Sequence, residues 1–131
     1  MILRHLKYLA LILLSVFLLS SIPLELNPKS IAINPSTDIS VIPNEMSDSV
    51  SIIDMSTQKV ISTIPVGKAP KGVSIDKALN LAVIGNSHDN IVSLIDMNTY
   101  RVIAVIPVGK SPEGIAIDSL THRAFVANHK D

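Results

Sequence analysis

Few residues in this 131-residue chain are of types that do chemistry. Beyond the first 22 residues the histidines are His88, His122 and His129, and none of them forms an H-x-x-x-H pair that would hold a metal on one element. His88 and His129 could share a metal between neighbouring loops, but a solvated turn histidine is the simpler interpretation. The chain has no cysteine, which excludes disulfides, thiolate metal ligands and a cysteine nucleophile. We therefore predict no metal and no cofactor.

Two aspartates occupy the same sequence context. Asp54 follows Val-Ser-Ile-Ile, and Asp96 follows Val-Ser-Leu-Ile 42 residues later. A carboxylate could serve general acid–base catalysis. However, an Asp that opens a turn accepts hydrogen bonds from backbone N–H groups two residues on, and identical recurrence in each unit is typical of scaffold residues. We assign both aspartates a structural role and predict that the protein is not an enzyme.

The elements that position these residues belong to an internal repeat of 42 residues. About half of the positions from 49 to 89 are identical to the residue 42 places later. Pro28, Pro70 and Pro112 keep the same register. The chain therefore holds two complete units and the first half of a third. The unit boundaries are residues 29–70, 71–112 and 113–131.

Each unit predicts four short strands rich in Val and Ile and separated by Gly, Asn, Asp and Ser. In the second unit the predicted strands span residues 72–75, 81–84, 91–95 and 102–108. Pro65 and Pro107 lie in the fourth strand, which indicates an outer edge because proline has no N–H for an interior ladder. A four-stranded unit of this length is typical of a propeller blade. We predict an all-β fold of four-stranded antiparallel β-propeller blades, two complete and half of a third.

Asparagine and glycine recur at fixed places in these units. Asn44, Asn86 and Asn128 end the second strand, where we expect left-handed backbone and hydrogen bonds to the turn. The glycines lie where one blade passes to the next and a small residue permits close passage of the backbone. These predicted structural glycines are Gly67, Gly72, Gly109 and Gly114.

The sequence resembles the YVTN-type β-propeller repeat, a family named for a tetrapeptide at the end of strand two. That place holds Val-Ile-Pro-Asn at 41–44, Val-Ile-Gly-Asn at 83–86 and Phe-Val-Ala-Asn at 125–128, so the Asn is kept and the initial Tyr is absent. The segments Val-Ser-Leu-Ile-Asp and Ile-Pro-Val-Gly-Lys-x-Pro-x-Gly also match the family's pattern. The resemblance covers residues 28–131. It implies an exported propeller, in a family whose members serve as binding proteins, surface-layer components and partners of redox enzymes.

The first unit departs most from this pattern. Ser30 replaces the glycine found at Gly72 and Gly114, and Pro43 lies within the second strand. We therefore expect the first unit to be a degenerate capping blade. The predicted domains are a leader, residues 1–22, and a partial β-propeller, residues 23–131.

The leader has the layout of a secretory signal. Arg4 and Lys7 precede an apolar stretch from Tyr8, which we predict to be a hydrophobic helix. It is either a cleaved signal peptide or an uncleaved signal anchor, since residues 6–22 reach the lower length limit for spanning a bilayer. In both cases the rest of the chain is predicted to be exported, to the periplasm, cell surface or medium. Membrane contact would come only through this segment.

The charge balance provides no basic field that would draw a polyanion by charge alone. The full chain is neutral, and without the leader nine basic residues face eleven acidic ones, a net charge of −2. Outside the leader the only aromatic residues are Tyr100 and Phe125. The chain therefore offers neither a basic groove nor stacking platforms for nucleic acid.

Topology narrows any binding surface to one side of the blades. In an up-and-down meander alternate turns lie on the same side, so the loops after strands two and four lie together. The turns at Asp76 and Asp96 lie on the opposite side. The candidate binding residues on the first side are Lys68, Lys71, Asn86, His88, Lys110, Asn128 and His129.

A propeller closes with about four to eight blades. Two and a half units leave an open sheet edge, through which the chain could self-associate. We predict a fragment of a longer propeller, acting as an exported, non-enzymatic module that binds or scaffolds a protein or small-molecule partner. The alternatives are the remnant of a periplasmic redox-associated propeller, partnered with a haem or quinone enzyme, and a nucleic-acid-binding propeller.

Overall fold

The computed structural model of the chain describes residues 24–130. The predicted leader and the hydrophobic helix expected in it lie outside this range. Within the described residues no helix is long and apolar enough to cross a membrane.

The described residues are almost entirely β-structure, as predicted. A single-turn 3₁₀ helix, Glu45–Ser47, lies between the second and third strands of the first sheet. The strands are β1 (Ala32–Asn34), β2 (Ile39–Asn44), β3 (Ser49–Asp54), β4 (Lys59–Pro65), β5 (Pro70–Asp76), β6 (Leu81–Asn86), β7 (Ile91–Asp96), β8 (Arg101–Pro107), β9 (Pro112–Asp118) and β10 (Arg123–Asn128).

These strands form three antiparallel meanders that correspond to the three repeat units. The first blade has the strand order β1-β2-β3-β4, the second β5-β6-β7-β8, and the third contributes the pair β9-β10. The prediction of two four-stranded blades and half of a third is therefore confirmed. Pro65 and Pro107 end β4 and β8, which are edge strands, so neither proline interrupts an interior ladder.

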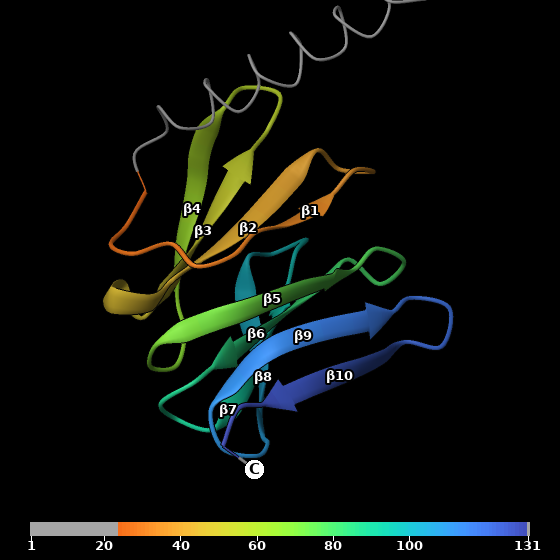
Figure 1. The fold of residues 1–131 in the computed structure, drawn as a ribbon. Helices are drawn as coiled ribbons and strands as arrows, with labels where there is room; N and C mark the ends of the chain where they lie inside the picture. The colour runs from red at the N-terminus through yellow and green to blue at the C-terminus, as the bar shows by residue number, and fades with distance from the viewer. Residues whose placement is uncertain (1–23, 131) are drawn as a thin grey trace, which may run out of the picture.

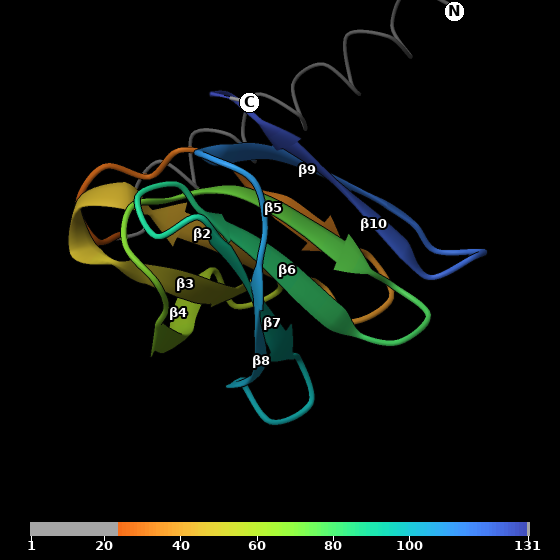
Figure 2. The same cartoon turned by 90° about the horizontal axis from the view of Figure 1, so that it is seen from below.

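The blades pack side by side through their broad faces, with their first strands adjacent (Figure 1). β5 lies beside β9, and the view from below shows the same neighbours (Figure 2). The core between the first two blades is aliphatic, because alternate residues of each strand face the neighbouring blade. Val41, Val50 and Ile52 of the first blade are completely buried against Ile84 and Ile95 of the second.

Glycine permits this close approach through its small volume. A Cβ atom on Gly72 would lie 2.3 Å from the backbone oxygen of Glu113 in the next blade, far inside van der Waals contact. No glycine among the described residues has a positive φ. The first blade has Ser30 at the equivalent position, and its hydroxyl donates a hydrogen bond to the backbone oxygen of Lys71. Its first strand is also short, three residues against seven in β5 and β9.

The prediction of left-handed backbone at the strand-ending asparagines is wrong. Asn44 is extended, with φ −111° and ψ 95°, because it still pairs with Ser49 in the ladder. The left-handed conformation falls on other turn residues, among them Asp48, Asn80 and Asn90. Several residues without the usual preference, including Gln58 and Tyr100, adopt it as well.

Candidate binding site

The loops after strands two and four lie together on one side of the blades. Ser87 and His88, which follow β6, donate backbone hydrogen bonds to the carbonyls of Ala69 and Lys68, at 3.0 and 3.3 Å. The same pair recurs one unit later, where His129 and Lys130 donate to Ser111 and Lys110, at 2.9 and 3.3 Å. Backbone pairing of each interblade connector with the loop after the second strand of the following blade therefore fixes this side of the molecule, which we call the loop face.

Side chains at the start of each third strand reinforce the loop face. Asp48 Oδ1 accepts a hydrogen bond from Ala69 N, and Asn90 Oδ1 accepts one from Ser111 N, both at 2.9 Å. These four residues have φ values between 50° and 57°, in the left-handed region. Asp89 Oδ2 also accepts a hydrogen bond from Lys68 N at 2.8 Å. These side chains therefore accept hydrogen bonds from backbone N–H groups of the connectors between blades and hold the connectors in place.

Two crevices open on the loop face, one between each pair of blades. The first has a volume of about 530 Å³ and is lined by Asn27, Glu45, Met46, Asp48, Lys68, Ala69 and His88. The second has a volume of about 270 Å³ and is lined by Ser87, His88, Asn90, Lys110, Ser111 and Lys130. They occupy equivalent places, but their charges differ. Two carboxylates line the first crevice, whereas the lining of the second, as far as residues 24–130 supply it, has two lysines and no carboxylate.

The structure divides the seven candidate binding residues. Lys68, His88 and Lys110 are exposed and line the crevices. His129 is exposed in the loop beside Ser111, outside the crevice lining. Sequence reasoning missed Lys130, although the repeat places it at the position of His88 and could have revealed it.

Lys71, on the first strand of the second blade, is engaged in ion pairs with one residue of each neighbouring blade. Its Nζ lies 2.9 Å from Glu113 Oε1 and 3.6 Å from Glu45 Oε1, and Lys29 pairs with Glu45 at 3.0 Å. The hydrogen bond to Glu113 raises the pKa of Lys71. The pKa of Glu113 is lowered by the same contact, and that of Glu45 chiefly by its hydrogen bond from Lys29. Lys71 therefore links three blades and does not line either crevice.

The strand-ending asparagines turn inward and bind the neighbouring strand, not the turn backbone as predicted. Asn86 is fully buried, and its Nδ2 donates to Ser93 Oγ at 2.9 Å. Asn44 Nδ2 donates likewise to Ser51 Oγ at 3.0 Å. The Oδ1 atoms of Asn44, Asn86 and Asn128 are buried and have no hydrogen-bond partner in the described part of the chain.

The recurring aspartates hold their turns in the way expected. Asp54 Oδ1 accepts hydrogen bonds from the backbone N–H of Ser56 and Thr57, at 2.9 and 3.1 Å, and Asp96 Oδ1 accepts one from Asn98 at 2.8 Å. The Ser56 hydroxyl, which also donates to Asp54, is the main cause that lowers the pKa of this carboxyl. The Thr121 hydroxyl does the same for Asp118.

On the side opposite the loop face, one ionisable pair joins the second and third blades. His122 Nδ1 lies 2.8 Å from Asp76 Oδ2, and Asp76 also accepts backbone hydrogen bonds from Ala78 and Leu79. The contact with His122 is the main cause that lowers the pKa of Asp76. Among residues 24–130, no three His, Asp or Glu side chains are placed to hold a metal ion.

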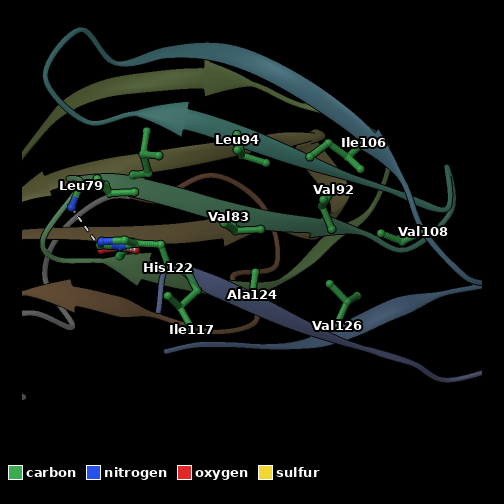
Figure 3. Close-up of a pocket in the computed structure, with 12 residues that line it drawn as sticks. Leu79, Val83, Val92, Leu94, Ile106, Val108, Ile117, His122, Ala124 and Val126 are labelled. Atoms are coloured by element: carbon green, nitrogen blue, oxygen red, sulfur yellow. Dashed lines mark hydrogen bonds and ion pairs between the residues drawn. The ribbon is translucent and has the colours of Figure 1, made fainter. Parts of the chain in front are cut away.

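A third hollow, which we call the interblade groove, lies between the second blade and the β9–β10 pair. It is apolar and has a volume of about 270 Å³. Figure 3 shows aliphatic side chains from both sides converging on it, with His122 at one end. The lining residues are Asp76, Leu79, Leu81, Val83, Val92, Leu94, Ile106, Val108, Ile117, His122, Ala124 and Val126.

Comparisons with known proteins support the fold. No protein-family model matches the chain, and no curated protein matches it. Among solved structures, Kuenenia stuttgartiensis hydrazine synthase is similar with a TM-score of 0.74 and 29% identity, covering 77% of this chain and 29% of that one. The β-propeller domain of Cps50 (Swd1) from Myceliophteria thermophila gives a TM-score of 0.70 at 15% identity, covering 83% and 33%.

AztD from Citrobacter koseri is also similar, with a TM-score of 0.62 and 14% identity, covering 71% of this chain and 26% of AztD. The chain thus spans between 26% and 33% of the length of these three structures. At such identities the second and third likenesses show the fold alone. The chain has a β-propeller fold, of which the described residues supply two complete blades and two strands of a third.

Proposed function

We propose that the chain is an exported, non-enzymatic β-propeller module of the YVTN-repeat type, part of a longer propeller, which binds an acidic partner through its loop face. The observation that carries the proposal is the second crevice. Its ionisable lining groups are His88, Lys110 and Lys130, on a framework of paired backbone loops. A preformed cleft lined by positive charge recognises carboxylate or phosphate groups at little cost in ordering.

The state of the carboxylates argues for binding and against catalysis. A general acid or base works best with a pKa near the operating pH. Asp54, Asp76 and Asp118 instead have lowered pKa values, caused by hydrogen bonds that hold turns or join blades. They are stabilised as carboxylates and committed to structural contacts. These carboxylates fit a protein that acts as a scaffold, in which they hold turns and blades in place while the loops face a partner.

Export rests on the N-terminal segment and on the repeat pattern. Arg4 and Lys7 followed by an apolar stretch form the layout of a secretory signal. Fractionation of the expressing cells, followed by N-terminal sequencing of the recovered protein, tests this part. Recovery in the soluble cytoplasmic fraction with Met1 intact would contradict it.

The binding proposal can be tested with a defined acidic probe. We expect a fluorescein-labelled deca-glutamate peptide to bind the full chain at low salt, measured by fluorescence anisotropy. Replacing both Lys110 and Lys130 with Glu should weaken binding by about tenfold or more, because like charges then face the probe. Lys68→Glu should weaken it less, since Glu45 and Asp48 already line that crevice.

Lys77→Glu provides the matched control. Lys77 is exposed in the turn after β5, on the side opposite the loop face, and its replacement changes the net charge in the same direction. Its effect should be small. The single variant Lys110→Glu, which changes the net charge by the same amount as Lys77→Glu, is the one to compare with it. If the two variants weaken probe binding equally, the attraction is only that of net charge and the loop face is not the site.

A second candidate function is the propeller part of a redox-associated protein. The observation that favours it is the likeness to Kuenenia stuttgartiensis hydrazine synthase at 29% identity. A coloured partner that co-purifies with the chain and absorbs in the visible range would support this function. Salt-sensitive retention on single-stranded DNA would instead support the nucleic-acid alternative, which the charge and aromatic content disfavour.

A further inference from the structure

The loop face carries one pair of neighbouring residues on each blade. In each pair, a residue of the loop after the second strand donates its backbone N–H to the carbonyl of a residue in the connector before the blade, with N and O 3.3 Å apart. The pairs recur at intervals of 42 residues, and all six residues are exposed. We call them the connector pairs, and they are, donor first, Met46 with Leu26, His88 with Lys68, and Lys130 with Lys110.

The first connector pair is apolar, whereas the other two are basic. Leu26 is 65% exposed and Met46 is 70% exposed. The equivalent positions in the second and third blades hold lysine at every place but one, which is a histidine. Two large apolar residues side by side on a surface indicate a contact site, because apolar groups gain free energy by leaving water.

The fold does not require apolar side chains at the first connector pair. Its connector precedes β1 and runs beside the single-turn helix after β2 (Figure 1). The N–H of Leu26 donates to Ser47 Oγ at 3.0 Å. In the second blade the N–H of Lys68 donates to Asp89 Oδ2 in the same way, at 2.8 Å. Backbone and polar groups therefore hold both connectors, and the side chains of Leu26 and Met46 are left to face solvent or a partner.

The crevice between the first two blades brings the apolar and the basic groups together. Met46 lines this crevice, and so do Lys68 and His88 of the next connector pair. Its volume of about 530 Å³ leaves room for side chains of a bound segment. Farther along the face, Lys110 and Lys130 line the second crevice. The loop face therefore changes from apolar on the first blade to basic on the second and third.

The carboxylates of the first crevice set the direction of this change. Glu45 Oε2 lies 3.0 Å from Lys29 Nζ and accepts a hydrogen bond from Asn27 Nδ2 at 2.8 Å, so its charge is balanced within the protein. Asp48 holds the connector through one oxygen, which accepts from Ala69 N, and it stays exposed. Acidic groups of a ligand are therefore attracted most strongly past this crevice, where the lining that the described residues supply has no carboxylate.

We infer that the loop face binds an extended segment of a partner protein that has large apolar residues at one end and acidic residues at the other. The apolar residues pack on Leu26 and Met46, and the acidic residues lie along the basic connector pairs of the second and third blades. This inference rests on the proposed function and adds the order of the two chemistries in the partner. A bilayer fits less well, because it would cover the whole face and bring its anionic headgroups to the exposed Asp48 and Asp89.

Two fluorescein-labelled acidic peptides of equal charge test the inference. One has two leucines followed by a run of glutamates, and the other has serines in place of the leucines. We expect the leucine peptide to bind the full chain at low salt about tenfold more tightly, measured by fluorescence anisotropy, because its leucines leave water against the apolar pair. Raising the salt concentration should weaken both peptides but keep the ratio of their affinities, since salt screens only the charged contacts.

The double variant Leu26→Ser with Met46→Ser removes the apolar pair from the chain. It should bind both peptides equally, with the affinity that the unaltered chain has for the serine peptide. Both residues are exposed and their backbone hydrogen bonds do not depend on the side chains, so the double variant should fold. Leu120→Ser is the matched control. Leu120 is 93% exposed in the turn between β9 and β10, on the side opposite the loop face, and its replacement should keep the preference for the leucine peptide.

The outcomes separate this inference from the proposed function. Equal affinities of the two peptides for the unaltered chain would overturn the inference alone, whereas absence of binding by both peptides would overturn both. An equal loss of preference in Leu120→Ser and in the double variant would also overturn the inference, because the leucines would then adhere to any apolar side chain. So would equal peptide affinities together with binding to phosphatidylglycerol vesicles that the double variant loses, since a membrane surface would then occupy the apolar pair.

Discussion

His122 Nδ1 lies 2.8 Å from Asp76 Oδ2, and this contact joins the second and third blades. The equivalent contact between the first and second blades is a hydrogen bond of 3.1 Å from Asn34 Nδ2 to Asn80 Oδ1. The partners of each pair are 46 residues apart in the sequence. The same interblade contact is therefore uncharged at one interface and ionisable at the next.

Replacing His122 with Ala should raise the pKa of Asp76 toward its ordinary value of 3.8, because the main cause of its lowering is removed. In the variant the N–H groups of Ala78 and Leu79 still lower the pKa of the carboxyl, whereas its burial raises it. A ¹³C NMR titration of the side-chain carboxyl measures the change. His88→Ala, on the loop face, is the control and should have no effect. An unchanged Asp76 pKa in His122→Ala would contradict the assignment.

The protein should lose stability as the solution is acidified below about pH 4.5. Carboxyl groups whose folded pKa is lowered stabilise the folded state above their unfolded pKa, and this contribution disappears as the pH falls through the folded value. Five carboxyl groups are of this kind: Glu45, Asp54, Asp76, Glu113 and Asp118. Urea unfolding at about pH 7, 5, 4 and 3 measures the effect. A midpoint that stays constant or rises between pH 5 and pH 3 would contradict the prediction.

Gly72→Ala should destabilise the fold by about 1–3 kcal/mol, the usual cost of inserting a methyl group into a packed site. The added Cβ would lie 2.3 Å from the Glu113 backbone oxygen, so that one of the two strands must move. Gly114→Ala is the matched control at the equivalent position of the third blade. There the nearest atom is the Cβ of Ala127 at 3.2 Å. We expect a change within about 0.5 kcal/mol for Gly114→Ala, and equal effects of the two would show that strand approach is not the constraint.

Asn86 and Ser93 should behave as a coupled pair in a double-mutant cycle. Ser93→Ala removes the acceptor for the buried Asn86 Nδ2, and Asn86→Ala removes the donor. Chemical unfolding of both single variants and the double variant should give a coupling energy of about 1 kcal/mol, since the second change costs little once the first is made. Strictly additive losses would show that the hydrogen bond contributes nothing to stability.

The sequence by itself determined the repeat, the strands and most of the turns. The alternation of Val and Ile with polar residues predicted strands whose limits agree with the structure within two residues, for example residues 81–84 within β6. The turn aspartates Asp54 and Asp96 could be assigned because they bind backbone only two or three residues away. Such features depend on local spacing, which a sequence displays directly.

The tertiary structure decided what the polar residues at and near the recurring positions contact. Lys68 and Lys71 both lie close to the boundary between the first two units, yet Lys71 is paired with Glu113 from the next unit and Lys68 lines a crevice. Asn86 turns inward to Ser93, because its backbone continues the ladder instead of entering the turn. Ile106 is exposed and the equivalent Ile64 is buried because only Ile64 is covered by a neighbouring blade in the described part of the chain. No local sequence pattern distinguishes the two residues. These contacts join neighbouring strands or different blades, so only the packing of one sheet against the next fixes them.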